Sequence, residues 1–529
     1  MRRSLLSILT TAVLASAAAL GAGPAEAAPA ACPRYTPSDV DGGGPDVIVG
    51  LPSYDLPGKP DAGALAVFSN VAAVGSSTPR APVRRTLVTA DSIPGLTAQA
   101  GARFGSAVFV EPDLYEPDDG DLCADVVVGV PGQDVGAVRG AGRVVTLRGA
   151  PGGLAGVLGS WDEGSLGGTG GAQAGAGFGW SITGLSGGAL LVAAPGRDLG
   201  SVADAGQLLW FSPAGSPNQT ASVVQQHGSG DDAAEPGDRF GEVLKGVSTE
   251  VGLVVLVGLP HEDVGSKADA GAVEVVVASN RASLVSQDSA GAGGAAEAGD
   301  RYGASVDVYF TGTQADRRGH VVIGVPGEDA GDVPDTGLVS FASFAAPHGG
   351  FYSSVGGEPL TLSQNSPGVW GGREPDDQYG AAVLAGSFSS ATPRGLVTAS
   401  PTEDLGAAAD GGVLDLINLR EDGSADPGVP GQAWTQDSPG VGDQVENGDR
   451  FGTAISSVPL IGTASLPSVL VTVPGEDVGT TPDAGLAYLG APPGAGSVLL
   501  TLPGPQAGAG LGMTPMQIAP DIIFSGAGG

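Results

Sequence analysis

The sequence has little positive charge. Its 529 residues include three lysines and 23 basic residues in all, against 57 acidic residues, so the formal net charge is −34. A surface with this balance repels phosphate backbones and anionic lipid headgroups, and it attracts cations. Charge alone therefore argues against nucleic acid and anionic membranes as partners.

Histidine is scarce, and the common nucleophile motifs are missing. The four histidines are far apart and show no metal-ligand spacing: His227, His261, His320 and His348. The sequence contains no Gly-x-Ser-x-Gly elbow and no glycine-rich phosphate loop that leads into a helix. We therefore assign no catalytic residue, although a glycosidase-like pair stays open among the 57 acids.

Only two cysteines are present, Cys32 and Cys123. In an exported protein two cysteines usually pair, and this bond would close a loop of about ninety residues, worth about 4 kcal/mol in the chain-entropy model. The alternative is two unrelated thiols. We predict the disulfide.

No apolar run of membrane-spanning length follows the first 30 residues. Residues 1–30 instead have the pattern of a secretory signal, with Arg2 and Arg3, an apolar stretch over 5–20, and the small-x-small sequence Ala25-Glu26-Ala27. We expect a secreted, extracellular monomer without a membrane span, exported by the general or the twin-arginine route. Residues 31–529 are then a single domain.

Two signatures alternate along that domain. An aromatic-glycine pair begins at residues 104, 178, 240, 302, 379 and 451, and apolar runs ending in proline occupy 47–52, 126–131, 190–195, 254–260, 321–326, 396–401 and 469–474. Successive prolines lie 79, 64, 65, 66, 75 and 73 residues apart. Each unit divides into four short strands separated by Gly-, Pro- and Asp-rich turns, which is typical of a propeller blade. We predict an all-β, seven-bladed β-propeller with four-stranded blades.

The two ends of the domain complement each other. The first unit lacks an aromatic-glycine pair, and the chain finishes with Leu511-Gly512 and an apolar segment over 513–519 that resembles the missing strand. Pairing the last strand with the first unit would remove two open sheet edges. The sequence therefore predicts a ring closed by its N- and C-terminal strands, and a linear β-solenoid is the main alternative.

The repeat resembles a known family. Asp300-Arg301-Tyr302-Gly303 followed by a run ending in Val325-Pro326-Gly327 is similar to the FG-GAP repeat of integrin α-chain propellers and of secreted bacterial FG-GAP proteins. The resemblance covers about residues 39–519. It implies a seven-bladed propeller that binds a ligand, as in cell adhesion. Glycosylphosphatidylinositol phospholipase D has a similar propeller beside a separate catalytic domain.

Repeats of this family often contain a calcium loop of the form Asp-x-Asp-x-Asp-Gly-x-x-Asp, whose alternating oxygens suit a hard cation. Two segments keep part of that pattern, and their weak candidate ligands are Asp39, Asp41 and Asp46 in one and Asp113, Asp119, Asp121 and Asp125 in the other. Ca²⁺ at these loops is one interpretation, and solvated turn aspartates are the other.

Acidic residues also recur around the two signatures. After the proline runs stand Glu262, Asp263, Asp269, Glu328, Asp329, Asp335, Glu403, Asp404, Asp410, Glu476, Asp477 and Asp483, and before the aromatic-glycine pairs stand Asp238, Asp300, Asp377 and Asp449. In a four-stranded meander both kinds of loop emerge at the same end of the blade, so we expect one acidic rim. The rim either binds a cation or a ligand, or its acids shape turns and pair with arginines.

Two classes of function follow. The first is an adhesion-type module that presents this rim to a protein or carbohydrate ligand, and the alternative is an extracellular hydrolase or lyase of polysaccharide or lipid on the same fold. An enzyme should show a few perturbed carboxylates in one asymmetric cleft, whereas a binding module should show a broad and nearly symmetric rim.

Overall fold

A computed structural model describes Cys32 and residues 38–518 of the chain. Within that range the described part omits 72–81, 112–121, 168–169, 186–187, 214–220, 227–232, 250–251, 278–280, 290–291, 313–316, 346–349, 353–359, 389–393, 421–423, 427–428, 430, 459–467, 491–497, 503 and 511–513. The predicted signal over 1–30 and the Leu511-Gly512 pair lie outside the described residues.

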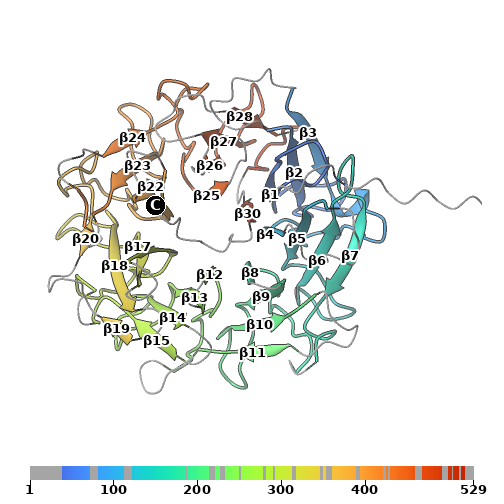
Figure 1. Cartoon of the computed structure of the whole chain (residues 1–529), viewed down its shortest axis with the longest axis horizontal. Helices are drawn as coiled ribbons and strands as arrows, with labels where there is room; N and C mark the ends of the chain where they lie inside the picture. Colours follow the sequence, from blue (N-terminus) through green and yellow to red (C-terminus); the bar gives the residue numbers. More distant parts are fainter. Residues whose placement is uncertain are drawn as a thin grey trace, which may run out of the picture.

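Seven β-sheets stand around a central axis, and the strands of each follow one another outward from it (Figure 1). The first three blades contain β1 (Val47–Leu51), β2 (Ala64–Ser69) and β3 (Arg84–Val88); β4 (Ala107–Glu111), β5 (Asp125–Val130), β6 (Arg143–Arg148) and β7 (Gly156–Trp161); and β8 (Ile182–Leu185), β9 (Ala189–Ala194), β10 (Gln207–Phe211) and β11 (Ser222–Val224).

The other four blades contain β12 (Val243–Thr249), β13 (Gly252–Leu259), β14 (Ala272–Val277) and β15 (Arg281–Val285); β16 (Ser305–Thr311), β17 (Arg318–Val325), β18 (Leu338–Ala345), β19 (Gly350–Tyr352) and β20 (Thr361–Leu362); β21 (Ala382–Gly386), β22 (Gly395–Ser400), β23 (Val413–Asn418) and β24 (Gln432–Trp434); and β25 (Ile455–Val458), β26 (Ser468–Val473), β27 (Leu486–Gly490) and β28 (Val498–Thr501). The predicted all-β, seven-bladed propeller is confirmed. One short 3-10 turn, Ala90–Ser92, is the only helical element among the described residues, and none of their helices is long and apolar enough to cross a membrane.

The second strand of each blade is apolar on both sides because a neighbouring blade covers each face of the sheet. Every residue of β1, β5, β22 and β26 is buried. The glycine inside several of these runs permits close contact between blades. A Cβ on Gly50 would lie 1.9 Å from the carbonyl oxygen of Gly105, so no larger residue fits there.

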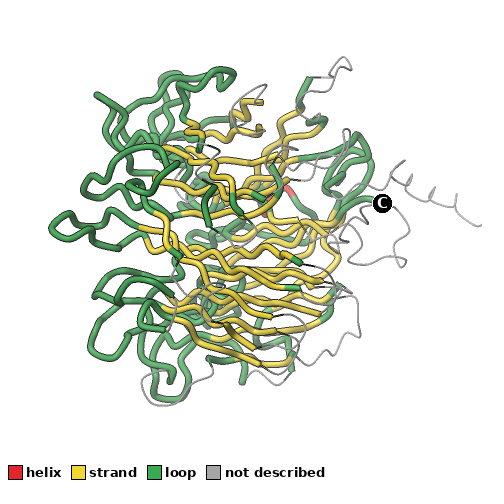
Figure 2. The backbone as a smooth tube through the Cα atoms, turned by 60° about the vertical axis from the view of Figure 1, so that its left-hand side comes forward, coloured by secondary structure: helices red, strands yellow, loops and turns green. Residues whose placement is uncertain are grey.

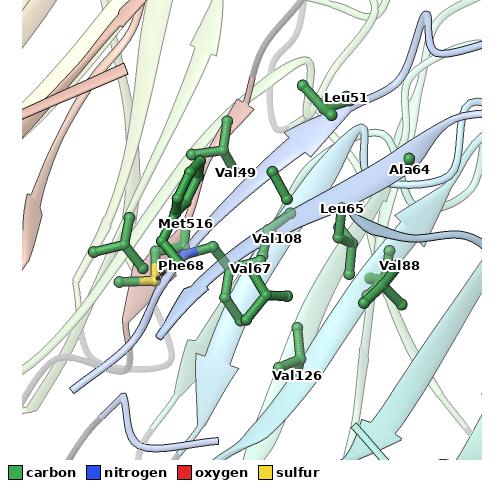
Figure 3. Close-up of a cluster of buried hydrophobic side chains, with 14 of the residues drawn as sticks. Val49, Leu51, Ala64, Leu65, Val67, Phe68, Val88, Val108, Val126 and Met516 are labelled. Atoms are coloured by element: carbon green, nitrogen blue, oxygen red, sulfur yellow. Dashed lines mark hydrogen bonds between the residues drawn. The ribbon is translucent and has the colours of Figure 1, made fainter. Parts of the chain in front are cut away.

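The chain ends close the ring as predicted. The C-terminal strand β29 (Thr514–Pro515) pairs antiparallel with β1, with Gly50 opposite Thr514. Met516 is fully buried beside Val49 and Phe68 (Figure 3), and its backbone N–H donates to Ile48 O at 3.1 Å. The chain continues into β30 (Gln517–Ile518), which pairs parallel with β4 of the second blade. The tail therefore joins two blades, one more than the sequence indicated.

A second connection holds the same two blades together. Cys32, ahead of β1, forms a disulfide with Cys123, ahead of β5, with their Cα atoms 5.3 Å apart. Backbone carbonyls of Asp39 and Asp41 accept hydrogen bonds from Ala124 N at 2.7 Å and Gly152 N at 2.8 Å. The segment before β1 is thus attached to blade 2.

Candidate functional site

The longest described loops project from one end of the strands, on the left-hand side in Figure 2. Loops from second to third strands meet there with loops that lead into the next blade, as a meander requires. The residue before each aromatic donates its backbone N–H to the preceding blade, for example Arg301 N to Asp269 O at 3.1 Å and Arg450 N to Asp410 O at 3.0 Å. The two acidic sets therefore lie side by side, and we call this end of the ring the rim.

The aspartates after the proline runs build their own loops. Asp263, Asp329, Asp404 and Asp477 each accept, through Oδ1, the backbone N–H of the aspartate six residues later, at 2.9–3.0 Å. The accepting loop ends in a residue with positive φ, between 47° and 51° at Asp269, Asp335, Asp410 and Asp483. Aspartate tolerates this left-handed conformation better than most residues. These eight side chains are half-exposed or exposed.

The remaining acids of the predicted rim are buried between blades. Asp238, Asp300 and Asp449 are 0–1% exposed, and Glu262, Glu403 and Glu476 are 1–5% exposed. Glu328 is half-buried. A ligand on the rim can therefore contact the aspartates of the proline loops. The seven less exposed acids named above belong instead to the packing between blades.

Each buried glutamate meets a glutamine from the end of the preceding blade. The Gln Nε2 to Glu Oε2 distances are 2.8 Å for Gln226 and Glu262, 2.6 Å for Gln287 and Glu328, 2.5 Å for Gln364 and Glu403, and 2.6 Å for Gln436 and Glu476. We call each such contact a seam. The sequence interpretation missed these glutamines, although Ser/Thr-Gln-Asp/Asn-Ser recurs at 286–289, 363–366 and 435–438.

Burial shifts the ionisation of the seam acids. It raises the pKa of Glu403 and of Glu476 to about 8, with neighbouring carboxylates adding to the shift. Burial likewise raises the pKa of Asp300 to about 7 and of Asp377 and Asp449 to about 6, against their backbone hydrogen bonds. Asp238 behaves in the same way, with a pKa of about 6. The perturbed acids thus repeat from blade to blade.

Among the described residues, the arginines before the aromatic-glycine pairs form few ion pairs with the rim acids. Arg450 Nη2 lies 3.7 Å from Asp410 Oδ2, and both side chains are well exposed, so this pair contributes little. Arg239 instead bonds Glu242 at 2.6 Å and covers the Trp180 ring, 5.1 Å from its centroid. Backbone hydrogen bonds, such as that from Arg450 N to Asp410 O, also join these loops of adjacent blades.

The first candidate calcium loop forms a compact cluster. Ligand oxygens of Asp39, Asp41 and Asp46 lie within 4.8 Å of one another, and all three residues are buried. Burial raises the pKa of Asp46 to about 8, with Asp41 adding to the shift. Oxygen donors at this spacing suit a hard cation, so the cluster could hold a metal ion.

The hydrogen bonds of the cluster show which oxygen needs a partner. Backbone N–H groups bond both oxygens of Asp39, Oδ1 of Asp41 and Oδ2 of Asp46, and Arg84 pairs with Oδ2 of Asp41. Asp46 Oδ1 is buried and has no hydrogen-bond donor. A cation would satisfy that oxygen, and Arg84 already supplies part of the counter-charge.

The second candidate loop is only partly described. Asp113, Asp119 and Asp121 lie outside the described residues. Asp125 is 3% exposed, and its Oδ1 accepts the backbone N–H of Gly149 at 3.1 Å. It thereby connects β5 to the end of β6.

Fold and site together define a seven-bladed β-propeller with an aspartate rim and polar seams. No protein-family model matches the chain, and no curated protein matches it. Membership of the FG-GAP family therefore remains a prediction from the motifs.

Several solved propellers are similar to the chain at low identity. A periplasmic gluconolactonase from Pseudomonas aeruginosa is 12% identical, with a TM-score of 0.41, over 89% of this chain and 99% of that one. An endo-arabinase from Bacteroides thetaiotaomicron is 9% identical, with a TM-score of 0.28, over 56% of this chain and 89% of that one. An α-L-arabinofuranosidase from Lactobacillus brevis is 8% identical, with a TM-score of 0.26, over 61% and 95%. Likeness this distant says nothing about the activity of the chain.

Proposed function

We propose that the protein is a secreted binding module that holds a cationic ligand, such as a basic segment of a cell-surface or extracellular protein, on its aspartate rim. The supporting observation is the repeated loop. In each of blades 4–7 two aspartates are fixed by the Oδ1 bond between them, and both remain partly or fully exposed. Eight negative groups are thus held in place around half of the ring before any ligand arrives.

The alternative is a hydrolase or lyase of polysaccharide or lipid. Catalysis requires perturbed groups that differ from their surroundings. Here most of the strongly shifted acids recur in four seams, are buried, and accept hydrogen bonds from their own loop or from a glutamine. Asp46 and Asp415 also have strongly raised pKa values and do not belong to this repeated set. Such repetition favours a structural role for the seam acids, and therefore the binding function.

Export fits the disulfide, because a cross-link between Cys32 and Cys123 persists in oxidising compartments. We also propose that Asp39, Asp41 and Asp46 hold Ca²⁺ as a structural ion. It would reinforce the junction of blades 1 and 2, where Asp39 and Asp41 already bond blade 2 through their carbonyls. A rise in melting temperature with Ca²⁺ that a chelator reverses, and that Asp46→Asn removes, is the expected result. An unchanged melting temperature would rule the ion out.

The rim is tested with an oligoarginine peptide as the probe and an oligoglutamate of equal length as its counterpart. Asp269, Asp335, Asp410 and Asp483 are changed together to Asn, which keeps the left-handed backbone and removes four charges. We expect oligoarginine binding that weakens at least about tenfold in this variant and falls with added salt.

Blade 6 offers a matched control. Asp410→Asn removes a rim charge, whereas Asp426→Asn removes one from the loop after β23, at the opposite end of the blade. Only the first should weaken binding. Equal effects, or no binding of the probe at low salt, would contradict the proposal. Turnover of a polysaccharide by the purified protein, lost on changing one carboxylate, would establish the alternative.

A further inference from the structure

A cavity of about 780 Å³ lies at the centre of the ring. The residues that line it belong to the innermost strands of blades 3–7 (β8, β12, β16, β21 and β25), or directly flank them, and include Gln517 and Ile518 of the C-terminal β30. Figure 1 shows β8, β12, β25 and β30 around the centre of the ring. Its size is within the range of small-molecule sites. The residues that line it are different from those of the rim.

The innermost strands show where the sevenfold repeat is broken. The residue five positions after the aromatic is, from blade 2 to blade 7, Phe109, Thr183, Lys245, Asp307, Leu384 and Ser456. Only blades 4 and 5 place charges there. With Glu242, these are the charged residues of the described cavity wall, and all three belong to adjacent blades.

Lys245 and Asp307 form an ion pair across two blades, with Nζ 3.1 Å from Oδ1. Asp307 also accepts backbone N–H bonds from Val308 at 2.9 Å and from Ala385 at 2.8 Å, and its side chain is 4% exposed. The side chain of Lys245 is 30% exposed and has donors beyond the one used by Asp307. The carboxylate is therefore satisfied, and the ammonium group is available to the cavity.

Glu242 is also neutralised. It bonds Arg239 at 2.6 Å and lies 3.6 Å from His261, whose other ring nitrogen is 2.9 Å from Asp269. Hydroxyl groups make up much of the remaining polar wall. Ser181 and Ser305 donate to the carbonyls of Gly241 and Gly380, which leaves their oxygens able to accept.

We propose that this axial cavity binds a small, neutral, polyhydroxylated molecule of mono- or disaccharide size, with the Lys245 ammonium as its principal hydrogen-bond donor. The wall is electrically balanced and mixes donors, acceptors and short aliphatic side chains. Anions are repelled by the net charge of −34, and cations are drawn to the rim. No aromatic side chain lines the described wall, so a flat ligand finds no stacking partner. The site goes beyond the proposed rim function and does not depend on it.

Calorimetric titration of the full-length protein with glucose, galactose, cellobiose and lactose tests the proposal, with glucuronate and glucosamine as charged counterparts. At least one neutral sugar should bind with a Kd of about 1 mM or tighter. The double variant Lys245→Met/Asp307→Leu replaces the ion pair by apolar residues, with leucine as at the equivalent position 384 of blade 6. It should fold and bind at least about tenfold more weakly.

The control is Lys267→Met, which removes a rim lysine paired with Asp288, outside the cavity, and should leave sugar binding unchanged. Ala381→Phe enlarges a lining side chain of blade 6 and leaves both residues of the ion pair unchanged. It must also abolish binding, so the proposal can still be tested if the double variant fails to fold. Binding that survives both changes overturns the proposal. So does the absence of neutral-sugar binding, or equal binding of either charged counterpart.

Discussion

The two halves of the ring solve the same packing problem with different chemistry. Blades 4–7 each place a buried or half-buried glutamate, its glutamine partner and a buried aspartate where they meet the preceding blade. Blades 2 and 3 have alanine in place of that aspartate, at Ala102 and Ala176. In place of the glutamate stand Gln133 and Arg197.

The seam between blades 2 and 3 reverses the charge. Arg197 Nη1 lies 3.3 Å from Glu163 Oε2, and Glu163 holds the position that glutamine has in the later seams. Gln207 donates to the other oxygen of Glu163 at 2.7 Å. The side chain of Glu163 is fully buried and that of Arg197 is 14% exposed. The comparison teaches that a seam needs a complementary polar bridge, and that the sign of the charge is secondary.

The largest effect is expected where the bridge is an ion pair. Glu163→Ala leaves the largely covered Arg197 without its buried carboxylate partner and should lower the free energy of unfolding by about 3 kcal/mol. Chemical denaturation of the parent and the variant measures it. The double change Glu163→Gln/Arg197→Glu introduces the glutamine–glutamate contact of blades 4–7 at this seam. It should restore most of the lost free energy of unfolding. A double variant no more stable than Glu163→Ala would show that the seams are not interchangeable.

The acid-rich half should make the protein less stable as pH rises. A carboxyl whose pKa is higher in the folded than in the unfolded chain contributes its full stabilisation of the fold at pH values below its ordinary pKa. That contribution is lost as the pH rises through the pKa of the folded state. With Glu403 and Glu476 at about 8 and Asp300 at about 7, the loss extends from about pH 4 to about pH 8. Melting temperatures measured from pH 5 to pH 9 should therefore fall.

A substitution localises this effect to one seam. Glu476→Gln mimics the protonated carboxyl, so the variant should match the parent at pH 5 and exceed it at pH 9. If the difference in melting temperature between variant and parent were the same at pH 5 and at pH 9, Glu476 would already be ionised at pH 5 in the folded protein.

A neutral seam should cost less to break than the charged one. Gln436→Ala removes the donor to Glu476, and both groups are almost completely buried, so a loss of about 2 kcal/mol is expected. Chemical denaturation of this variant and of Glu163→Ala compares the free energy of unfolding that each half of the ring loses. A larger loss for Gln436→Ala would reverse the ranking.

The smallest effect is expected on the rim. Asp477→Asn keeps the Oδ1 that accepts Asp483 N at 2.9 Å, so stability should change by less than about 0.5 kcal/mol. Asp477→Ala removes that acceptor and should cost about 1 kcal/mol. Identical melting of the two variants would show that the loop does not depend on this bond.

Much of the architecture could be predicted because each blade repeats local signals. The apolar runs and the aromatic-glycine pairs gave the blade count, and the unmatched chain ends gave the closure that β29 and β1 form. The seams were harder to predict. Gln436 and Glu476 are 40 residues apart, and nothing in the local pattern of either indicates that they meet. The sequence also did not indicate which acids are exposed, since Asp477 is exposed and the adjacent Glu476 is 3% exposed.

By itself, the sequence determined which segments become strands and how many sheets form, because strand propensity, turn residues and repeat spacing act over short distances. Tertiary structure decided which acids are buried, which glutamine each one meets, and that Lys245 and Asp307 face a common cavity. Those outcomes depend on desolvation and on contacts between blades, and both arise only when the ring has closed.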